Sequence, residues 1–270
     1  MISAETKPDG IVPCLLRYDI APGVTAFSTT RMGGVSKGPY AEFNVNHYCG
    51  DDEQDIAINY ASLCRLLGID GAHLVYPHQV HGTEIRKIDA GWLSLSKSDQ
   101  AQLLEGVDAV MSDMPGMCVG VSTADCIPVL LYDAAHHACA AIHAGWRGTV
   151  ARITERAVQA MATAYATEAS QLRAVIGPSI SLENFEVGDE VYEAFENAGF
   201  DMERIARRYA KWHIDLWETN RLSLLAMGVP ASAIHISGIC TYAQADRFFS
   251  ARRLGINSGR ILTGIMLDEG

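Results

Sequence analysis

Three polar segments beside apolar, strand-like runs carry residue types that bind metals. Cys126 lies between two such runs, at 117–121 and 127–132, which are rich in β-branched and leucine residues and too short for helices. His143 follows a third apolar run, and His81 precedes a fourth. Because each segment places one soft or borderline ligand at a strand end, we predict that the three residues form one site assembled from distant parts of the chain.

The chemistry predicted for these residues is that of a catalytic zinc site. Zinc accepts two imidazoles and one thiolate, and three protein ligands leave a fourth position for water or substrate. His81, Cys126 and His143 supply this set, and copper is the less favoured metal. Taken alone, each is more often an ordinary buried residue. His78 is the nearest competitor, but on a strand it would point away from His81, so we leave it out of the ligand set.

Other polar residues in these segments suit a reaction with an anionic substrate. Asp125 adjoins Cys126 and could act as a general acid or base, although a carboxylate at a strand end also commonly accepts backbone hydrogen bonds. Arg31, in a glycine-rich loop, and Arg147 suit bidentate binding of phosphate, unless they form structural ion pairs. We assign catalytic roles to His81, Cys126, Asp125 and Arg147. Contacts with the substrate are assigned to Arg31, Asn44, Gln79 and Cys240.

Length, charge and cysteine content limit the kind of protein. With 270 residues, 49% of them hydrophobic, the chain can build a large core, and we expect a single domain over residues 1–270. The formal charge of −11 argues against nucleic acid or an anionic membrane as a partner. Without a bilayer-spanning apolar run or a signal-peptide pattern, a cytoplasmic protein is expected. The seven cysteines contain no C-x-x-C pair, so disulfides are not expected.

Apolar periodicity predicts the elements that must position these residues. Helical spacing predicts helices over 51–68 and 149–166, the second beginning just after His143, and shorter helices near 189–197 and 215–227. A pair of strands is expected within 11–30. Further strands are expected at 73–76, 83–88, 117–121, 127–132, 138–142, 172–176, 234–239 and 261–267. Because strands outnumber helices and few alternate strictly with them, we predict an α+β sandwich of mixed sheets.

The motifs taken together resemble those of the bacterial YfiH/YlmD family, also known as laccase-domain polyphenol oxidases. They are Thr29-Thr-Arg-Met-Gly-Gly-Val-Ser36, Gln79-Val-His-Gly82, Thr123-Ala-Asp-Cys126, His143-Ala-Gly-Trp-Arg-Gly148, Ile176-Gly-Pro178, Glu186-Val-Gly188 and Phe248-Phe-Ser250. The resemblance implies a layered α/β/β/α sandwich, a zinc ion, and phosphorolysis of purine nucleosides with adenosine deamination. Two departures concern the rim of the pocket. Asn184-Phe185 stands where the family often has Cys-Tyr, and Ala251-Arg-Arg-Leu254 replaces Tyr-Arg-Arg-Asp.

Four functions are compatible with these features. The first is a zinc-dependent purine nucleoside phosphorylase that uses phosphate and adenosine, inosine or methylthioadenosine, with adenosine deamination as a side activity. The second is a metal-dependent amidase that removes L-serine from a peptidoglycan precursor. A copper polyphenol oxidase is weaker because the nine histidines contain no H-x-H pair. A non-catalytic binding module leaves the open metal position unexplained. The H-x-E and P-C-x-x-C motifs of cytidine-type deaminases do not occur, so deamination would require another acid, most simply Asp125.

Overall fold

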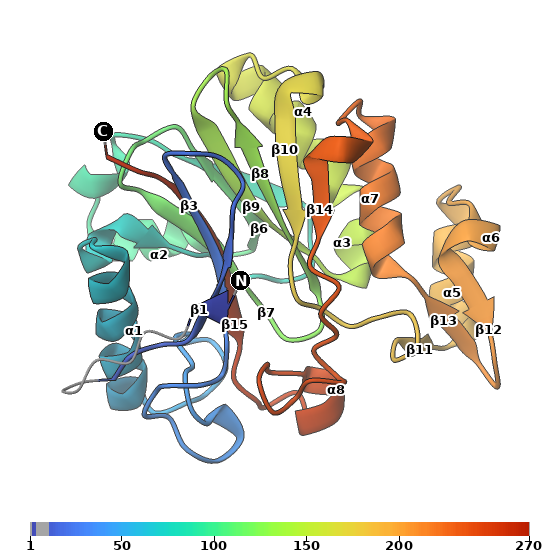
Figure 1. The fold of residues 1–270 in the computed structure, drawn as a ribbon, viewed down its shortest axis with the longest axis horizontal. Coiled ribbons are helices and arrows are strands. Elements are labelled where there is room, and N and C mark those ends of the chain that lie inside the picture. Colours follow the sequence, from blue (N-terminus) through green and yellow to red (C-terminus); the bar gives the residue numbers. More distant parts are fainter. Residues whose placement is uncertain (1, 4–10, 270) are drawn as a thin grey trace.

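Two six-stranded mixed sheets form the centre of the fold (Figure 1). The computed structural model describes residues 2–3 and 11–269. In spatial order, the first sheet contains β1 (Ile2–Ser3), β2 (Leu15–Tyr18), β3 (Val24–Thr29), β15 (Ile261–Leu267), β7 (Cys118–Thr123) and β4 (Leu74–Val75). The second contains β14 (Ile234–Ile236), β10 (Leu172–Ile176), β8 (Ile127–Asp133), β9 (Ala138–Ala144), β6 (Val107–Ser112) and β5 (Glu84–Ile88). Parallel pairs among antiparallel ones make both sheets mixed.

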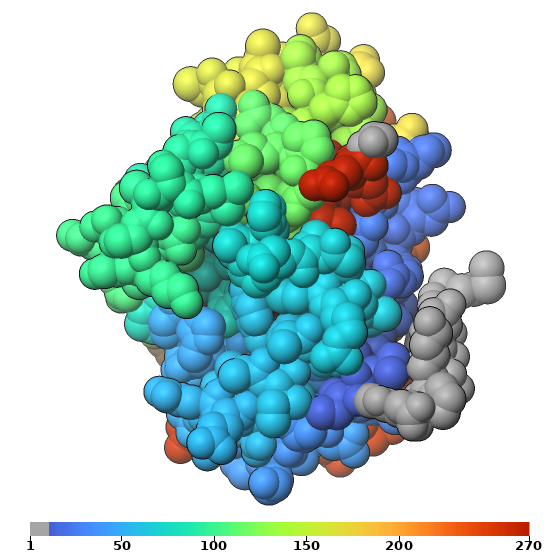
Figure 2. Space-filling view, turned by 90° about the vertical axis from the view of Figure 1, so that its left-hand side faces the viewer, coloured from blue at the N-terminus to red at the C-terminus, as the bar shows by residue number. Residues whose placement is uncertain are grey.

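The two sheets pack face to face, and helices cover their outer faces. Successive residues of a strand point to opposite sides, so β8 places Leu130 between the sheets and Leu131 under the helices. α1 (Glu53–Leu67) packs on the first sheet through Leu63, and Figure 2 views the molecule from that side. α4 (Ile153–Tyr165) and α7 (Leu216–Ala226) pack on the second sheet. This order of layers confirms the expected α/β/β/α sandwich.

A small third sheet projects from the side of the second sheet (Figure 1, orange) and was not expected from the sequence. Its antiparallel strands are β11 (Glu186–Val187), β13 (Trp212–Ile214) and β12 (Ala206–Arg208), with α5 (Asp189–Asn197) and α6 (Met202–Ile205) beside them. Strands this short have no periodicity to detect. The remaining helices are α2 (Lys97–Leu104), α3 (Trp146–Val150) and α8 (Ala251–Leu254), with 3-10 turns at 38–40, 71–73, 92–94, 169–171 and 231–233. Among the described helices, none has the length and apolar character needed to cross a membrane.

Most predicted elements are present, with shifts of a few residues at their ends. α1 begins after Asp52, whose carboxylate accepts hydrogen bonds from two main-chain N–H groups of the first turn. It ends at Gly68, which has the left-handed conformation that glycine adopts without strain. The prediction of one continuous helix over 149–166 was wrong. Arg152 has a φ of 65°, which interrupts the helix and separates α3 from α4. β6 was also missed.

The chain crosses from the first sheet to the second at two places that matter for the site. Residues 124–126 connect β7, which lies beside the edge strand β4, to β8 of the second sheet, and residues 76–83 connect β4 to β5. Each of these connections carries one of the predicted metal ligands, Cys126 in the first and His81 in the second. The third predicted ligand, His143, lies within β9, whose neighbours in the second sheet are β8 and β6.

The core between the sheets should dominate the stability of the protein. Leu130 is fully buried there, so Leu130→Ala should lower the free energy of unfolding by about 2–5 kcal/mol, through lost burial and the cavity left behind. Leu93→Ala removes the same atoms from a leucine that is 43% exposed. It should change the free energy of unfolding by less than about 0.5 kcal/mol. Urea denaturation of both variants measures the difference; equal losses would contradict this account of the core.

Candidate metal centre

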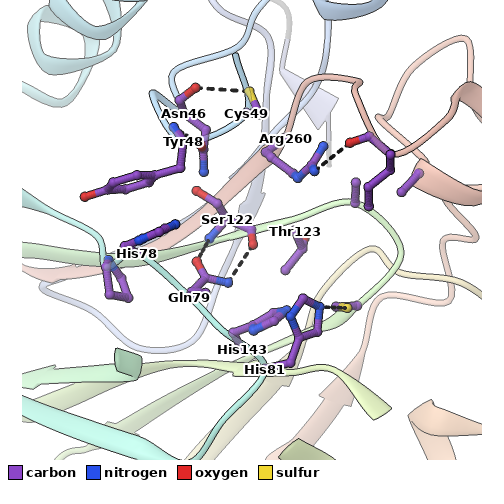
Figure 3. A pocket seen from close by; sticks show the side chains of 15 residues that line it. Asn46, Tyr48, Cys49, His78, Gln79, His81, Ser122, Thr123, His143 and Arg260 are labelled. Atoms are coloured by element: carbon purple, nitrogen blue, oxygen red, sulfur yellow. Dashed lines mark hydrogen bonds between the residues drawn. The ribbon is translucent and has the colours of Figure 1, made fainter. Parts of the chain in front are cut away.

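The three predicted ligands lie together, where the two crossings meet β9. Figure 3 shows His81 and His143 side by side. The ligand atoms of His81, Cys126 and His143 all lie within 4.8 Å of one another. Cys126 Sγ is 3.7 Å from His81 Nε2, and the two imidazole rings meet edge to face with centroids 4.8 Å apart. The structure thus brings together residues that the sequence separates by up to 62 positions, since 143 − 81 = 62.

Asp108, a residue that the sequence analysis did not single out, holds the centre in place. Its side chain is fully buried, and Oδ1 accepts a hydrogen bond from His143 Nδ1 at 2.7 Å. Oδ1 also accepts the main-chain N–H of His81 at 2.9 Å, and Oδ2 accepts those of Val80 and Gly82 at 3.2 and 2.7 Å. A carboxylate only accepts, so Nδ1 of His143 carries the hydrogen and Nε2 is left for a metal.

Cys126 and His143 form a buried pair whose pKa values shift in opposite directions. Burial by itself raises the pKa of the Cys126 thiol, but the charge of His143 and hydrogen bonds from His143 and His81 outweigh it and lower that pKa to about 6. Burial would lower the pKa of His143, yet the Cys126 sulfur and the Asp108 carboxylate raise it to about 9. These shifts favour a thiolate beside an imidazolium, so Cys126 is already in the form that binds metals, whereas His143 must release its Nε2 proton when a metal ion binds.

The residues around the centre fit a tetrahedral zinc ion. Bonds of about 2.0 Å to nitrogen and 2.3 Å to sulfur place ligand atoms about 3.5 Å apart, close to the Cys126–His81 separation. Gly145 leaves the necessary room, because a Cβ there would lie 2.7 Å from His81 Cδ2 and 3.2 Å from Cys126 Sγ. Two imidazoles and one thiolate, with no fourth protein ligand in the described cluster, match an open catalytic zinc site.

Two residues of the crossings adopt left-handed backbone conformations that are uncommon outside glycine. His81 has a φ of 62° and Asp125 a φ of 85°. The first is held by the N–H groups bound to Asp108. The second is held by its own carboxylate, whose oxygens accept hydrogen bonds from Thr241 Oγ1 and from the main-chain N–H of Arg252, each at 2.7 Å. The ligands are thus positioned by turns that buried hydrogen bonds hold.

A cavity of about 160 Å³ opens beside the three ligands. It lies against the β7–β8 crossing, the β4–β5 crossing and the loops around residues 48 and 258 (Figure 3). Besides the ligands, its lining includes Asn46, Tyr48, Cys49, His78, Gln79, Ser122, Thr123 and Arg260. Ser122 Oγ and Thr123 Oγ1 are buried and have no hydrogen-bond partner within the part of the chain that the structure describes, which leaves two unsatisfied hydroxyls on residues of the cavity wall.

Gln79 is the predicted substrate contact that lines this cavity, although its amide is already engaged. Its Nε2 donates to the Ser122 carbonyl at 2.8 Å, and its Oε1 accepts the Ser122 N–H at 2.7 Å. The Gln79 side chain therefore makes the pair of hydrogen bonds to the Ser122 main chain that a neighbouring strand would make. Asn44 lies behind the cavity wall, where its Oδ1 accepts the main-chain N–H of Arg260 and its Nδ2 donates to Asp51.

Four other predicted site residues do not line the cavity. Arg31 donates to the carbonyl groups of Ala41 and Ala245, and Arg147 is exposed, with its guanidinium over the Trp146 ring. The Asp125 carboxylate faces Thr241 and the start of α8, as described above. Cys240 is buried, and its sulfur accepts from the Ser181 main-chain N–H at 3.4 Å. None of these four residues is therefore among those that line the cavity.

Arg260 and Tyr48 are cavity residues that the sequence analysis missed, and His78 is one that it considered only as a metal ligand. Three N–H groups of Arg260 donate to the carbonyl groups of residues 256, 258 and 259, which fixes the guanidinium and leaves its other N–H groups available. His78 lies outside the ligand cluster, as expected, but the reason given was wrong. Residues 76–83 form a turn and not a strand, so His78 and His81 line the same cavity.

The two departures from the family pattern differ in their contact with the cavity. Ala251 lines the cavity at the start of α8, whereas Leu254 packs with Phe248 and Phe249. Asn184 donates to Cys240 Sγ and to Ser181 Oγ, and the guanidinium of Arg252 lies over the Phe185 ring at 5.5 Å. Of the changed positions, Ala251 is the one in direct contact with the cavity, and its small side chain leaves this part of the rim open.

Known proteins match the chain over almost its whole length. The family model described as multi-copper polyphenol oxidoreductase laccase matches residues 25–268. A purine nucleoside phosphorylase of Bacteroides thetaiotaomicron is 50% identical over 249 residues, 91% of this chain and 92% of that protein. An adenosine deaminase from an unknown prokaryotic organism is 44% identical over 246 residues, 90% and 94% of the two chains. The crystal structure of YlmD from Geobacillus stearothermophilus has a TM-score of 0.88 and 32% identity, covering 98% of each chain.

Metal content should depend on the ligands and on Asp108. We expect about one zinc per chain in the wild-type protein, and its loss in Cys126→Ser and His143→Ala. Asp108→Asn should weaken zinc binding by about 10- to 100-fold, because the residue behind a ligating histidine fixes its tautomer and orientation. Elemental analysis and competition with a chelating dye measure both effects.

The control for this prediction is Asp99→Asn, an exposed aspartate at the first turn of α2. It should bind zinc like the wild type. The circular dichroism spectrum should stay native in the ligand variants and after chelation, since the sandwich has its own core. Full zinc retention in both ligand variants would contradict the assignment of the ligands. Collapse of the spectrum on chelation would show that the metal is needed for folding and would favour a structural site.

Proposed function

The chain belongs to the multi-copper polyphenol oxidoreductase laccase family, and on this basis we propose that it is a zinc-dependent purine nucleoside phosphorylase. The observation that carries the proposal is its 50% identity, over nearly the full length of both chains, to a protein of that name. Phosphate and a purine nucleoside such as adenosine, inosine or methylthioadenosine would be the substrates. The cavity beside the metal centre is the proposed site of reaction.

The metal centre would supply electrostatic assistance. Zinc held by His81, Cys126 and His143 would act as a Lewis acid with one position open to a substrate oxygen. The protein residues around it orient the reactants. Phosphorolysis needs a phosphate oxygen placed against the anomeric carbon of the ribose, and positioning with charge stabilisation is sufficient for this without a protein nucleophile.

Arg260 is the cation that we assign to phosphate. Its guanidinium lines the cavity and is fixed by main-chain carbonyl groups, so little side-chain entropy is lost on binding an anion. Ser122 and Thr123 line the same cavity, and their buried hydroxyls, which are unpaired among the described residues, would donate to phosphate or ribose oxygens after a change of side-chain rotamer. Arg31 and Arg147, the candidates from the sequence, have their guanidinium groups turned to other partners.

The multicopper oxidase named in the family description has less support. Enzymes of that kind hold several copper ions, whereas the described residues contain a single group of three side chains with metal-binding geometry.

An adenosine deaminase activity is a second candidate, favoured by the relative of that name at 44% identity. Deamination would need a proton-transferring group close to the metal. Asp125 was the residue expected for this role, but both of its carboxylate oxygens already accept hydrogen bonds, which weakens the deaminase alternative.

The decisive test of the proposal is the dependence of base release on phosphate. Purified protein should convert inosine or adenosine to the free base and ribose 1-phosphate only when phosphate is supplied. Arg260→Gln should raise the KM for phosphate by about tenfold or more, because a charge-assisted contact to the anion is lost. Chromatography of base and sugar phosphate across phosphate concentrations measures both.

Arg156→Gln is the matched control, since this exposed arginine of α4 donates to the Ala151 carbonyl away from the cavity. It should have wild-type kinetics. Arg147→Gln in the same assay decides between the arginine expected from the sequence and Arg260. Base release that is equally fast without phosphate would refute phosphorolysis, and release of L-serine from a muropeptide would favour the amidase alternative.

A further inference from the structure

His78 and Tyr48 form an aromatic pair on one wall of the cavity, apart from the three metal ligands (Figure 3). Their rings are stacked, with centroids 4.2 Å apart and planes inclined by 17°. His78 Nδ1 lies 2.9 and 2.8 Å from the two carboxylate oxygens of Glu105. Neither residue of this pair is a metal ligand or has been assigned to phosphate. The role of the pair in the cavity is therefore still to be assigned.

Main-chain hydrogen bonds hold the pair on both sides. The His78 N–H donates to the Leu104 carbonyl at 3.1 Å, and the Gly106 N–H donates to the His78 carbonyl at 3.0 Å. The Tyr48 N–H donates to Asn46 Oδ1 at 2.7 Å. The histidine ring is therefore fixed by its backbone, by Glu105 and by stacking, and such restraint is typical of side chains that must keep a defined direction.

The hydrogen bond to Glu105 determines what the other ring nitrogen can do. A carboxylate only accepts, so Nδ1 of His78 carries a hydrogen in either charge state, and Nε2 is the nitrogen that gains or loses a proton. Within the described residues no hydrogen bond engages Nε2, and the side chain is 38% exposed. His78 therefore presents one exchangeable proton at the cavity wall.

Phosphorolysis of a purine nucleoside requires such a proton. The following inference rests on the proposed function. When the bond between C1′ of the ribose and N9 of the purine breaks, its electron pair stays on the base, and a proton at N7 neutralises the developing negative charge. His81, Cys126 and His143, which would hold the zinc ion, and Arg260 line the parts of the cavity that would suit phosphate. The stacked rings of Tyr48 and His78 form the aromatic side, which suits a planar base.

We propose that His78 is the general acid that protonates the departing purine, with Glu105 as its positioning residue and Tyr48 as its stacking partner. A phosphate oxygen forms the bond to C1′ while the C1′–N9 bond breaks. The electron pair of that bond remains on the purine, and the proton on His78 Nε2 moves to N7. Phosphate enters as HPO4²⁻ and leaves as a ribose 1-phosphate dianion, so its proton is released to solvent and restores the protonated His78.

The test compares two substrates that differ in their need for a proton. The purine of 7-methylinosine carries a positive charge and leaves without protonation, whereas inosine needs the acid. His78→Gln should lower kcat for inosine by about 100-fold or more and change kcat for 7-methylinosine by less than about threefold. Glu105→Gln should give a smaller loss with the same selectivity for inosine.

His136→Gln is the matched control. His136 is also 38% exposed, and its Nδ1 lies 2.9 Å from an oxygen of Asp133, but it is not among the cavity residues. This variant should cleave both nucleosides like the wild type. Zinc content and circular dichroism of His78→Gln should be unchanged, which separates the acid role from damage to the neighbouring ligand His81.

Other outcomes would overturn the proposal. Equal losses on the two nucleosides would show that His78 only binds or supports structure, and an unchanged rate on inosine would show that it has no part in the reaction. Loss of zinc from His78→Gln would assign the residue to the metal centre. A wild-type protein that cleaves neither nucleoside would refute the proposed function itself, which is a different result from selective failure of the His78 variant.

Discussion

The site depends on the buried carboxylate of Asp108. It accepts hydrogen bonds from one imidazole and three successive main-chain N–H groups, and so joins β6, β9 and the turn that carries His81. Burying a carboxylate is costly unless its oxygens are bound. Burial by itself raises the pKa of Asp108, but the hydrogen bond and charge of His143 and the N–H groups of Gly82 and Val80 lower it overall. The ionised form is therefore favoured in the folded protein.

The architecture explains why the ligands meet where they do. Apolar side chains fill most of the space between the packed sheets, and the connections that leave one sheet for the other bring polar side chains together. The crossings that carry His81 and Cys126 provide two such places, and β9 supplies the third ligand beside them. Gly145 then keeps the space between the ligands free, because any larger residue would displace His81.

Sequence patterns predicted the parts of this site that involve rare residue types at strand ends. His81, Cys126 and His143 could be found in this way, and so could α1, with its cap at Asp52 and its glycine at the end. Arg260 could not, because it lies in an irregular loop with no periodicity. Asp108 was hidden within an apolar run, although a single carboxylate in a buried strand is itself a signal. The glycine-rich loop of Arg31 suggested an anion site, but its arginine ties two loops of the chain together.

The position of the ligands also sets the order of events during biosynthesis. Cys126 and His81 are separated by 45 residues and belong to connections between different pairs of strands. Closing such loops in an unfolded chain is entropically unfavourable. Before both sheets have formed, the free energy of one metal–ligand bond does not compensate for this loss of entropy. We therefore expect a newly made chain to complete its sandwich before it binds an ion. In that order, the geometry of the finished protein, rather than the first metal encountered during synthesis, would select which ion is kept.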